Sequence, residues 1–202
     1  WGTARPKSQS SRQRSTSIWP SREADFLDLL ERPSFGCTKN RIFQVEFFGS
    51  DILGYSVIGN DSDLGFLIKK CKYALVTVGQ IKSPLLRIRL FELAEKSGFI
   101  LPNIISPRAY VSKYAAIGKG TIIMHDALVN ANTQIGENCI INSKALIEHD
   151  CSISNHCHIS TSATINGGVV VKSGSFIGSG TITKESIIIG KNSFIKSKSL
   201  VI

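Results

Sequence analysis

The chain has 202 residues, of which 42% are hydrophobic, and its formal net charge is +9. This length fits one large or two small domains, and the hydrophobic share is ordinary for a soluble globular protein. No apolar run approaches the roughly 18 residues of a membrane span. The start lacks the charged-then-apolar pattern of a signal peptide, so we expect a cytoplasmic protein with no membrane partner.

The excess positive charge is concentrated at the N-terminus. Residues 1–22 carry five Lys or Arg and no acid, whereas residues 23–108 and 109–202 are close to balanced. The repeat region also offers few aromatic side chains on which bases stack, so we expect no nucleic-acid partner. Because residues 1–22 are rich in Ser and Arg and have little apolar periodicity, we interpret them as disordered or non-native.

Residues 23–106 alternate between helical and strand-like patterns. A short helix around 26–30, a strand at 41–48 and a helix over 61–71 come first. An apolar run at 73–78 has the length of a buried strand and ends at Gly79 and Gln80.

A helix then begins at Ser83 and Pro84 and stops at Gly98, with Leu86, Leu90 and Leu93 on one face. A strand over 99–105 follows. The alternation predicts a small, truncated Rossmann-like α/β domain with a parallel sheet. Ligands of open α/β sheets bind at the carboxyl ends of strands, so Gly79 and Gln80 are candidates for contacting a nucleotide. A plain strand-to-helix loop is equally compatible, since no Gly-x-Gly-x-x-Gly fingerprint is present.

Residues 107–202 follow a six-residue repeat that predicts a parallel β-helix. Sixteen positions spaced six apart are Ile or Val, with Thr183 the one exception. Period six suits neither a helix nor a plain strand, but it fits short strands joined by tight corners, three to a coil of 18 residues. Residues n and n+18 then stack about 4.8 Å apart, in about five coils. The series is Val111, Ile117, Ile123, Val129, Ile135, Ile141, Ile147, Ile153, Ile159, Ile165, Val171, Ile177, Thr183, Ile189, Ile195 and Val201.

A second column, two residues before the first, holds mainly small side chains, including Cys139, Cys151 and Cys157. The cysteines lack metal-binding spacing, so we interpret them as buried, inert thiols. Cys139 and Cys157 differ by 18 and should stack, which permits a disulfide geometrically. A reducing compartment disfavours that bond.

The four histidines differ in their neighbours. His149 lies between Glu148 and Asp150, just past a predicted corner. A carboxylate beside an imidazole orients the ring and raises its basicity, as a general base requires. Gly167 follows His149 by 18 residues and should stack on it, where its N–H would stabilise an oxyanion. The alternative is that Gly167 and Gly168 only turn a corner.

We interpret two of the other histidines, His125 and His156, as structural. The spacings between successive histidines are 24, 7 and 2. Trimeric hexapeptide carbonic anhydrases hold zinc with a His-x4-His pair and a distant third histidine, which these spacings do not match. The sequence therefore predicts no metal site.

The run Ile-Glu-His-Asp-Cys at 147–151 resembles a motif of the NeuD/PglD-type family of sugar O- and N-acetyltransferases, which are hexapeptide-repeat acyltransferases. The similarity extends over about 45–202. Further matching stretches lie at 54–60, 73–79, 141–142, 158–160 and 167–168.

The resemblance implies a left-handed β-helix and direct acetyl transfer from acetyl-CoA, without an acyl-enzyme or a metal. It implies that His149 is the general base and Asp150 its acidic partner. Asn142 would line the acceptor site. His158 would lie near the acetyl-CoA thioester, and the Gly167 N–H would contact the acetyl carbonyl.

The acceptor that the resemblance implies is an amino sugar or a sialic-type sugar, free or nucleotide-linked, in bacterial surface polysaccharide biosynthesis. The assembly it implies is a homotrimer with active sites between subunits. Two family features have no counterpart here, a glycine-rich phosphate loop in residues 1–22 and a tail after Ile202. These departures favour the alternative, a non-catalytic trimeric scaffold that assists a sugar-biosynthesis enzyme.

Overall fold

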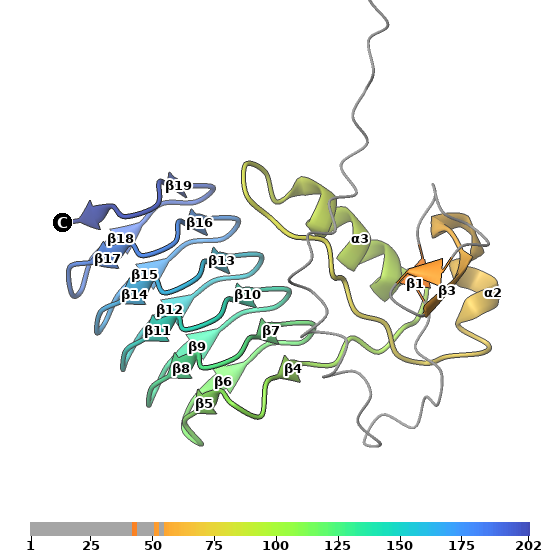
Figure 1. Ribbon diagram of the computed structural model, residues 1–202, viewed down its shortest axis with the longest axis horizontal. Helices are drawn as coiled ribbons and strands as arrows, with labels where there is room; N and C mark the ends of the chain where they lie inside the picture. The colour runs from red at the N-terminus through yellow and green to blue at the C-terminus, as the bar shows by residue number, and fades with distance from the viewer. Residues whose placement is uncertain (1–41, 44–50, 53–54) are drawn as a thin grey trace, which may run out of the picture.

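The computed structural model describes residues 42–43, 51–52 and 55–202. Our expectations for residues 1–22, for the helix near 26–30 and for most of the strand at 41–48 lie outside this part. The larger part is a solenoid of short strands, and a smaller part with helix α3 packs beside it (Figure 1). No helix within the described ranges is long and apolar enough to cross a membrane.

Seventeen two-residue strands wind around the solenoid and form three parallel sheets. The first sheet contains β4 (Ile104–Ile105), β7 (Ile122–Ile123), β10 (Ile140–Ile141), β13 (His158–Ile159), β16 (Phe176–Ile177) and β19 (Phe194–Ile195). The second contains β5 (Tyr110–Val111), β8 (Leu128–Val129), β11 (Leu146–Ile147), β14 (Thr164–Ile165), β17 (Ile182–Thr183) and β20 (Leu200–Val201). The third contains β6 (Ala116–Ile117), β9 (Gln134–Ile135), β12 (Ser152–Ile153), β15 (Val170–Val171) and β18 (Ile188–Ile189).

The strand register confirms the predicted parallel solenoid of about five coils. Ile141 pairs with Ile123 on one side and with Ile159 on the other, so each residue stacks on the one 18 positions away. From Ile123 to Ile189 every member of the six-residue series is at most 4% exposed. Burial of aliphatic side chains along one continuous core therefore stabilises the coils.

Side chains in the column of small residues also form hydrogen bonds to backbone carbonyls. Thr121 Oγ1 donates to Gly136 O at 2.8 Å, and Cys139 Sγ donates to Ser154 O at 3.2 Å, in each case to the residue 15 positions later. Cys157 makes the same contact with Lys172 O at 3.3 Å. These buried side chains therefore satisfy corner carbonyls of the next coil. Cys139, Cys151 and Cys157 are free thiols.

The corners depend on left-handed backbone conformations. From Gly120 to Lys198, every sixth residue has a positive φ, and Asn132 and Asp150 are among them, with φ of 57° and 60°. Glycine, asparagine and aspartate adopt this region at the least cost, and such residues hold many of these positions. Asp150 thus occupies a corner whose backbone is set by the repeat.

The smaller part begins with a three-stranded sheet. Strand β3 (Tyr55–Gly59) pairs in parallel with β1 (Ile42–Phe43) and antiparallel with β2 (Asp51–Ile52). The expected helix over 61–71 is shorter in the structure, with a 3-10 turn η3 (Asp61–Asp63) and helix α2 (Leu64–Leu67).

The apolar run at 73–78 joins none of the sheets of the described residues. Its strand-like contact is one parallel bridge, between Tyr73 and Ile100. Ile104–Ile105, expected at the end of the preceding α/β strand, instead pairs with β7 as the first strand of the solenoid. A Rossmann-like sheet is thus not seen in the described part of 23–106, and that part of the fold and the domain boundaries stay predictions.

Helix α3 (Leu85–Lys96) buries residues beside the predicted leucine face, and of those leucines Leu90 is partly buried against the core. Its buried residues are Arg87, Phe91 and Ala94, whereas Leu86 is 41% exposed. The reason is that α3 packs on the solenoid, where Phe91 meets the His156 ring edge-on at 5.9 Å between centroids. The helix ends before Gly98, whose φ of 89° stops it as expected.

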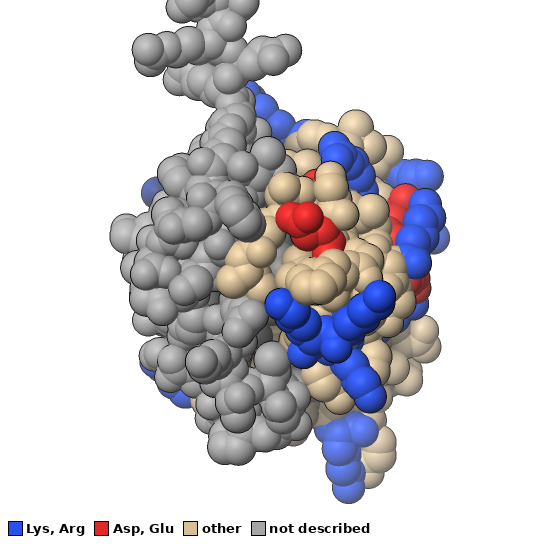
Figure 2. All heavy atoms as spheres, turned by 90° about the vertical axis from the view of Figure 1, so that its right-hand side faces the viewer, with Lys and Arg blue, Asp and Glu red and all other residues tan. Residues whose placement is uncertain are grey.

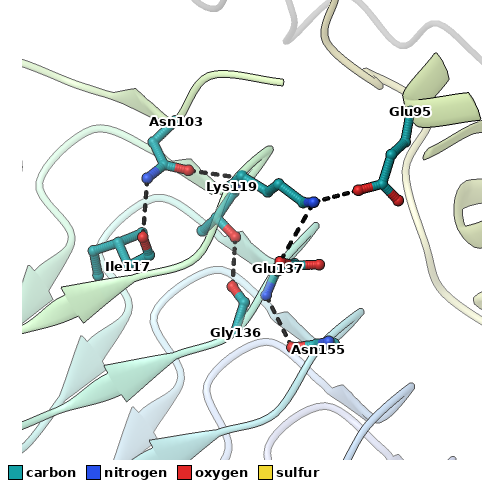
Figure 3. Close-up of polar contacts among 8 residues, drawn as sticks. Glu95, Asn103, Ile117, Lys119, Gly136, Glu137 and Asn155 are labelled. Atoms are coloured by element: carbon teal, nitrogen blue, oxygen red, sulfur yellow. Dashed lines mark hydrogen bonds and ion pairs between the residues drawn. The ribbon is translucent and has the colours of Figure 1, made fainter. Parts of the chain in front are cut away.

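Polar side chains attach α3 and the apolar run at 73–78 to the coils. Arg87, 1% exposed, donates from Nη1 to Val76 O (2.6 Å) and Val78 O (2.8 Å), and from Nε to Asn138 O (3.3 Å). Burial lowers the Arg87 pKa to about 10. At the first coils, Lys119 pairs with Glu95 of α3 and lies 3.7 Å from Glu137 (Figure 3).

The residues that precede the solenoid, 55–103, form a front segment that covers one outer face of the coils (Figure 1). Ile122, Ile140, His158 and Phe176 point outward from the β4–β19 sheet, yet each is at most 8% exposed. On the face beyond α2, basic side chains are seen at several places with acidic ones among them, not as one continuous basic surface (Figure 2).

Candidate active site

His149 and Asp150 lie at a corner of the solenoid, between strands β11 and β12. The coil before provides Asn130, Ala131 and Asn132 at the same corner, and the coil after provides Gly167. The Asp150 N–H donates to Ala131 O at 3.1 Å, and the Gly168 N–H donates to His149 O at 3.0 Å. Backbone hydrogen bonds on both sides therefore hold His149 in register.

His149 and Asp150 form a hydrogen-bonded pair, with 2.7 Å between Nδ1 and Oδ2. The carboxylate accepts, so Nδ1 carries the proton and Nε2 keeps its lone pair. The bond to Asp150 raises the His149 pKa, and the charge of Glu148 adds to the effect. With 62% of its side chain exposed, the imidazole is accessible from solvent.

Asp150 has two hydrogen-bonding partners. Its Oδ1 accepts from Asn132 Nδ2 at 2.6 Å, while Oδ2 is taken by His149. The Asn132 bond, followed by the His149 bond, lowers the Asp150 pKa. Asp150 is therefore an ionised carboxylate at neutral pH.

The structure places Gly167 directly against the His149 ring, as the 18-residue stacking predicts. A Cβ built on Gly167 would lie 3.0 Å from both Cε1 and Nε2 of His149. Gly167 lies outside the left-handed region, whereas Gly168 has a φ of 70°. The left-handed corner residue is therefore Gly168, and the lack of a side chain at Gly167 allows the imidazole to lie this close to its backbone.

Asn142, His158 and Gln80 form a second group at another corner. His158 Nδ1 lies 2.5 Å from Gln80 O, and its Nε2 lies 3.2 Å from Asn142 Nδ2. A carbonyl only accepts, so Nδ1 carries the proton and Nε2 accepts from Asn142. Burial lowers the His158 pKa to about 4, so the ring is neutral at physiological pH.

Gln80 fastens the front segment to the coils. Its side chain is 1% exposed, and Nε2 donates to His156 O at 3.0 Å and to Gly174 O at 3.3 Å. Gly79 differs, because a Cβ added there would meet no atom within 4 Å. A substrate contact by either residue stays a prediction.

The two groups lie at opposite ends of strand β11. Asn142 precedes the strand and His149 follows it, and at about 3.3 Å per residue the seven residue steps between them can span up to about 23 Å. Within one chain, the structure joins His149 with Asp150 and Gly167, and Asn142 with His158 and Gln80. It does not bring the two groups together.

Asn132 was not singled out in the sequence, although it precedes Asp150 by 18 residues and the stacking rule points to it. Of the other histidines, His125 Nδ1 lies 2.5 Å from Ser106 Oγ, and His156 Nδ1 lies 3.0 Å from Asn138 Nδ2. Among the described residues, no group of three or more His, Cys, Asp or Glu side chains is placed to hold a metal ion.

Comparison with known proteins first defines the class of the coils. Residues 114–149 match the family described as bacterial transferase hexapeptide (six repeats). No curated protein sequence is similar enough to count as a match.

Solved structures of acetyltransferases are similar over most of the chain. One is a histidine-to-asparagine variant of perosamine N-acetyltransferase from Caulobacter crescentus, in complex with CoA and GDP-perosamine. It is 29% identical with a TM-score of 0.76, and the match covers 80% of this chain and 76% of that chain. The acetyltransferase domain of PglB from Neisseria gonorrhoeae is 27% identical with a TM-score of 0.77, covering 86% and 84%. It has also been solved with acetyl coenzyme A.

WeeI from Acinetobacter baumannii, at 20% identity and a TM-score of 0.64 over 88% of each chain, shares the fold. Together with the repeat match, the acetyltransferase structures confirm the resemblance to hexapeptide-repeat sugar acetyltransferases of the NeuD/PglD type. They support an acyltransferase enzyme.

Proposed function

We propose that the protein transfers the acetyl group of acetyl-CoA to the amino group of a nucleotide-linked amino sugar. The observation that carries this proposal is the His149–Asp150 pair beside Gly167, which combines an oriented, exposed imidazole with a glycine backbone that lies against its ring. The neighbouring structures contain CoA, acetyl coenzyme A and GDP-perosamine, which supports this donor and this class of acceptor. Synthesis of bacterial surface sugars is the corresponding role.

In the proposed mechanism, His149 Nε2 takes a proton from the acceptor amine while the amine nitrogen attacks the acetyl carbonyl carbon. The carbon–sulfur bond then breaks, and CoA leaves as a thiol with the proton that His149 returns. Asp150 stabilises the imidazolium that forms between these steps. Among the described residues the Gly167 N–H has no hydrogen-bond acceptor, so it is available for the carbonyl oxygen of the acetyl group.

We infer that the second group, Asn142 and His158, belongs to the same site through a neighbouring subunit. The outer face of the β5–β20 sheet carries Leu128, Leu146, Ile182 and Leu200, and Leu200 is 71% exposed. Apolar faces of this kind pack in oligomers. Because this sheet lies between the two corners, packing it against a second copy brings the His149 corner near the partner's second group.

A homotrimer with left-handed coils, as the resemblance implies, meets this requirement. In such an assembly His158 would lie near the thioester and Asn142 near the acceptor, while Gly79 and Gln80 would border the sugar nucleotide. Light scattering tests the trimer, which should have three times the chain mass of 22.0 kDa. A monomer at micromolar concentration would contradict the shared site.

Two measurements test the function. Isothermal titration should detect acetyl-CoA binding, and a thiol-release assay should detect turnover with nucleotide-linked 4-amino sugars. The same assay is run with sialic-type acids, which offer hydroxyl groups as acceptors in place of an amine. A correctly assembled protein that binds no acetyl-CoA would contradict the proposal and leave the scaffold alternative.

A further inference from the structure

The two acids that flank His149 are each held by an asparagine of the preceding coil. Asn130 Nδ2 donates to Glu148 Oε2 at 2.9 Å, and Asn132 Nδ2 donates to Asp150 Oδ1 at 2.6 Å. In both pairs the asparagine precedes the acid by 18 residues, so the coil register creates both contacts. Only one of the two acids, Asp150, bonds to the imidazole.

The Asp150 carboxylate would be poorly oriented without a second contact. Its side chain is 54% exposed, and the terminal torsion of an aspartate is broad. Because Asn132 takes Oδ1, the remaining oxygen Oδ2 is directed at His149 Nδ1. The backbone hydrogen bond from Asp150 N–H to Ala131 O, next to Asn132, keeps the two successive coils in register at this corner.

We propose that Asn132 is a positioning residue for the general base: it orients the Asp150 carboxylate, which in turn fixes the tautomer and direction of His149. The inference rests on the proposed function in that it deepens the role of His149. The corner then contains a hydrogen-bonded chain of three side chains, from Asn132 to Asp150 to His149. Enzymes often use such a third group to orient a base.

The charged groups that act on His149 are few. Asp150 and Glu148, both from its own corner, raise its pKa. The preceding coil presents Asn130, Ala131 and Asn132, and the following coil presents Gly167, none of which is charged. A change in the His149 titration on altering Asn132 is therefore transmitted through Asp150.

The test is the variant Asn132→Gly. Glycine accepts the φ of 57° at this position without strain, so the change removes the amide and leaves the corner intact. The matched control is Asn130→Ala, which frees the acid that does not bond to the ring. Melting temperatures and oligomeric state are compared first, and both variants should match the wild type closely.

The first readout is histidine NMR without any substrate, with the His149 signals assigned by their loss in His149→Ala. In Asn132→Gly the His149 pKa should fall outside the titration error, because a released Asp150 stabilises the imidazolium less. In Asn130→Ala the His149 pKa should change less than in Asn132→Gly. An unchanged His149 titration in Asn132→Gly, or an equal shift in both variants, would overturn the proposal.

The second readout is steady-state turnover. In Asn132→Gly, kcat should fall about tenfold, part of the hundredfold or more that a general base supplies, while KM for acetyl-CoA stays within twofold. The acid limb of the kcat profile should move to lower pH in parallel with the NMR titration. Because the NMR readout needs no catalysis, a wild-type protein without acetyl transfer would contradict the proposed function and still leave Asn132 testable.

Discussion

The backbone of Gly167 lies against the imidazole of His149, so that a Cβ at Gly167 would stand 3.0 Å from both Cε1 and Nε2 of the ring. The two residues are 18 positions apart and occupy the same corner in successive coils. Any side chain at 167 would therefore displace the imidazole of His149.

Gly167→Ala should reduce turnover about tenfold, because displacement of a catalytic group by a fraction of an ångström misaligns the reaction. The melting temperature should change little, since the backbone at Gly167 lies outside the left-handed region. Turnover per folded molecule and thermal unfolding are measured on the same preparations.

Gly168→Ala is the matched control for this substitution. Gly168 has a φ of 70°, and an alanine there costs about 1 kcal/mol or more of stability. We expect a lower melting temperature with nearly normal activity per folded molecule. If Gly167→Ala shows that same pattern, Gly167 serves only the corner and the oxyanion role is wrong.

His149→Ala should lower kcat about a hundredfold or more, the usual contribution of a general base, and leave acetyl-CoA affinity nearly unchanged. The wild-type rate should rise with pH through the His149 pKa, which Asp150 holds above the ordinary histidine value. Asp150→Asn should move this rise in rate to lower pH and should reduce kcat less than His149→Ala does. Near-normal turnover in His149→Ala would place the base elsewhere.

Counting in steps of 6 and 18 was sufficient to predict the coil register and the stacking of Gly167 on His149. The reason is that each coil repeats one geometry, so a position in the sequence determines a position in space. The same counting leads to Asn132 above Asp150.

The front segment was predicted less well because its structure depends on packing against the coils. The apolar run at 73–78 has strand composition, yet its carbonyls at Val76 and Val78 accept from the Arg87 side chain. Leucine spacing in α3 did not identify Arg87 as a buried residue, because a charged side chain is not expected in a core. Nothing in the residue pattern connects Gln80 with His158, which are 78 positions apart.

Ile159→Asp should unfold the coils, because Ile159 is 0% exposed and an uncompensated charge in the core costs several kcal/mol or more. The control is Ile188→Asp, at a position that is 69% exposed on the outer side of the third sheet. Circular dichroism and thermal unfolding distinguish the two. A folded Ile159→Asp variant with wild-type stability would contradict the inward orientation of this column.

Stability should decrease as the pH falls from about 6.5 toward 4, because His158 is buried in its neutral form. The folded-state pKa is about 4 and the ordinary histidine pKa is 6.5, so between these values the unfolded chain binds a proton that the folded chain does not. The loss from this one group reaches up to about 3 kcal/mol at the acid end. Denaturant unfolding at pH 7, 6, 5 and 4 measures it.

His158→Gln removes the titrating group, so the variant should start less stable at pH 7 and lose less stability than the wild type over this window. His149→Gln is the control with the opposite sign. The His149 pKa is raised in the folded chain, so that group favours folding at acid pH and its removal should steepen the decline. If His158→Gln keeps the wild-type slope between pH 6.5 and 4, the ring is not buried in its neutral form and its contact with Gln80 does not hold in solution.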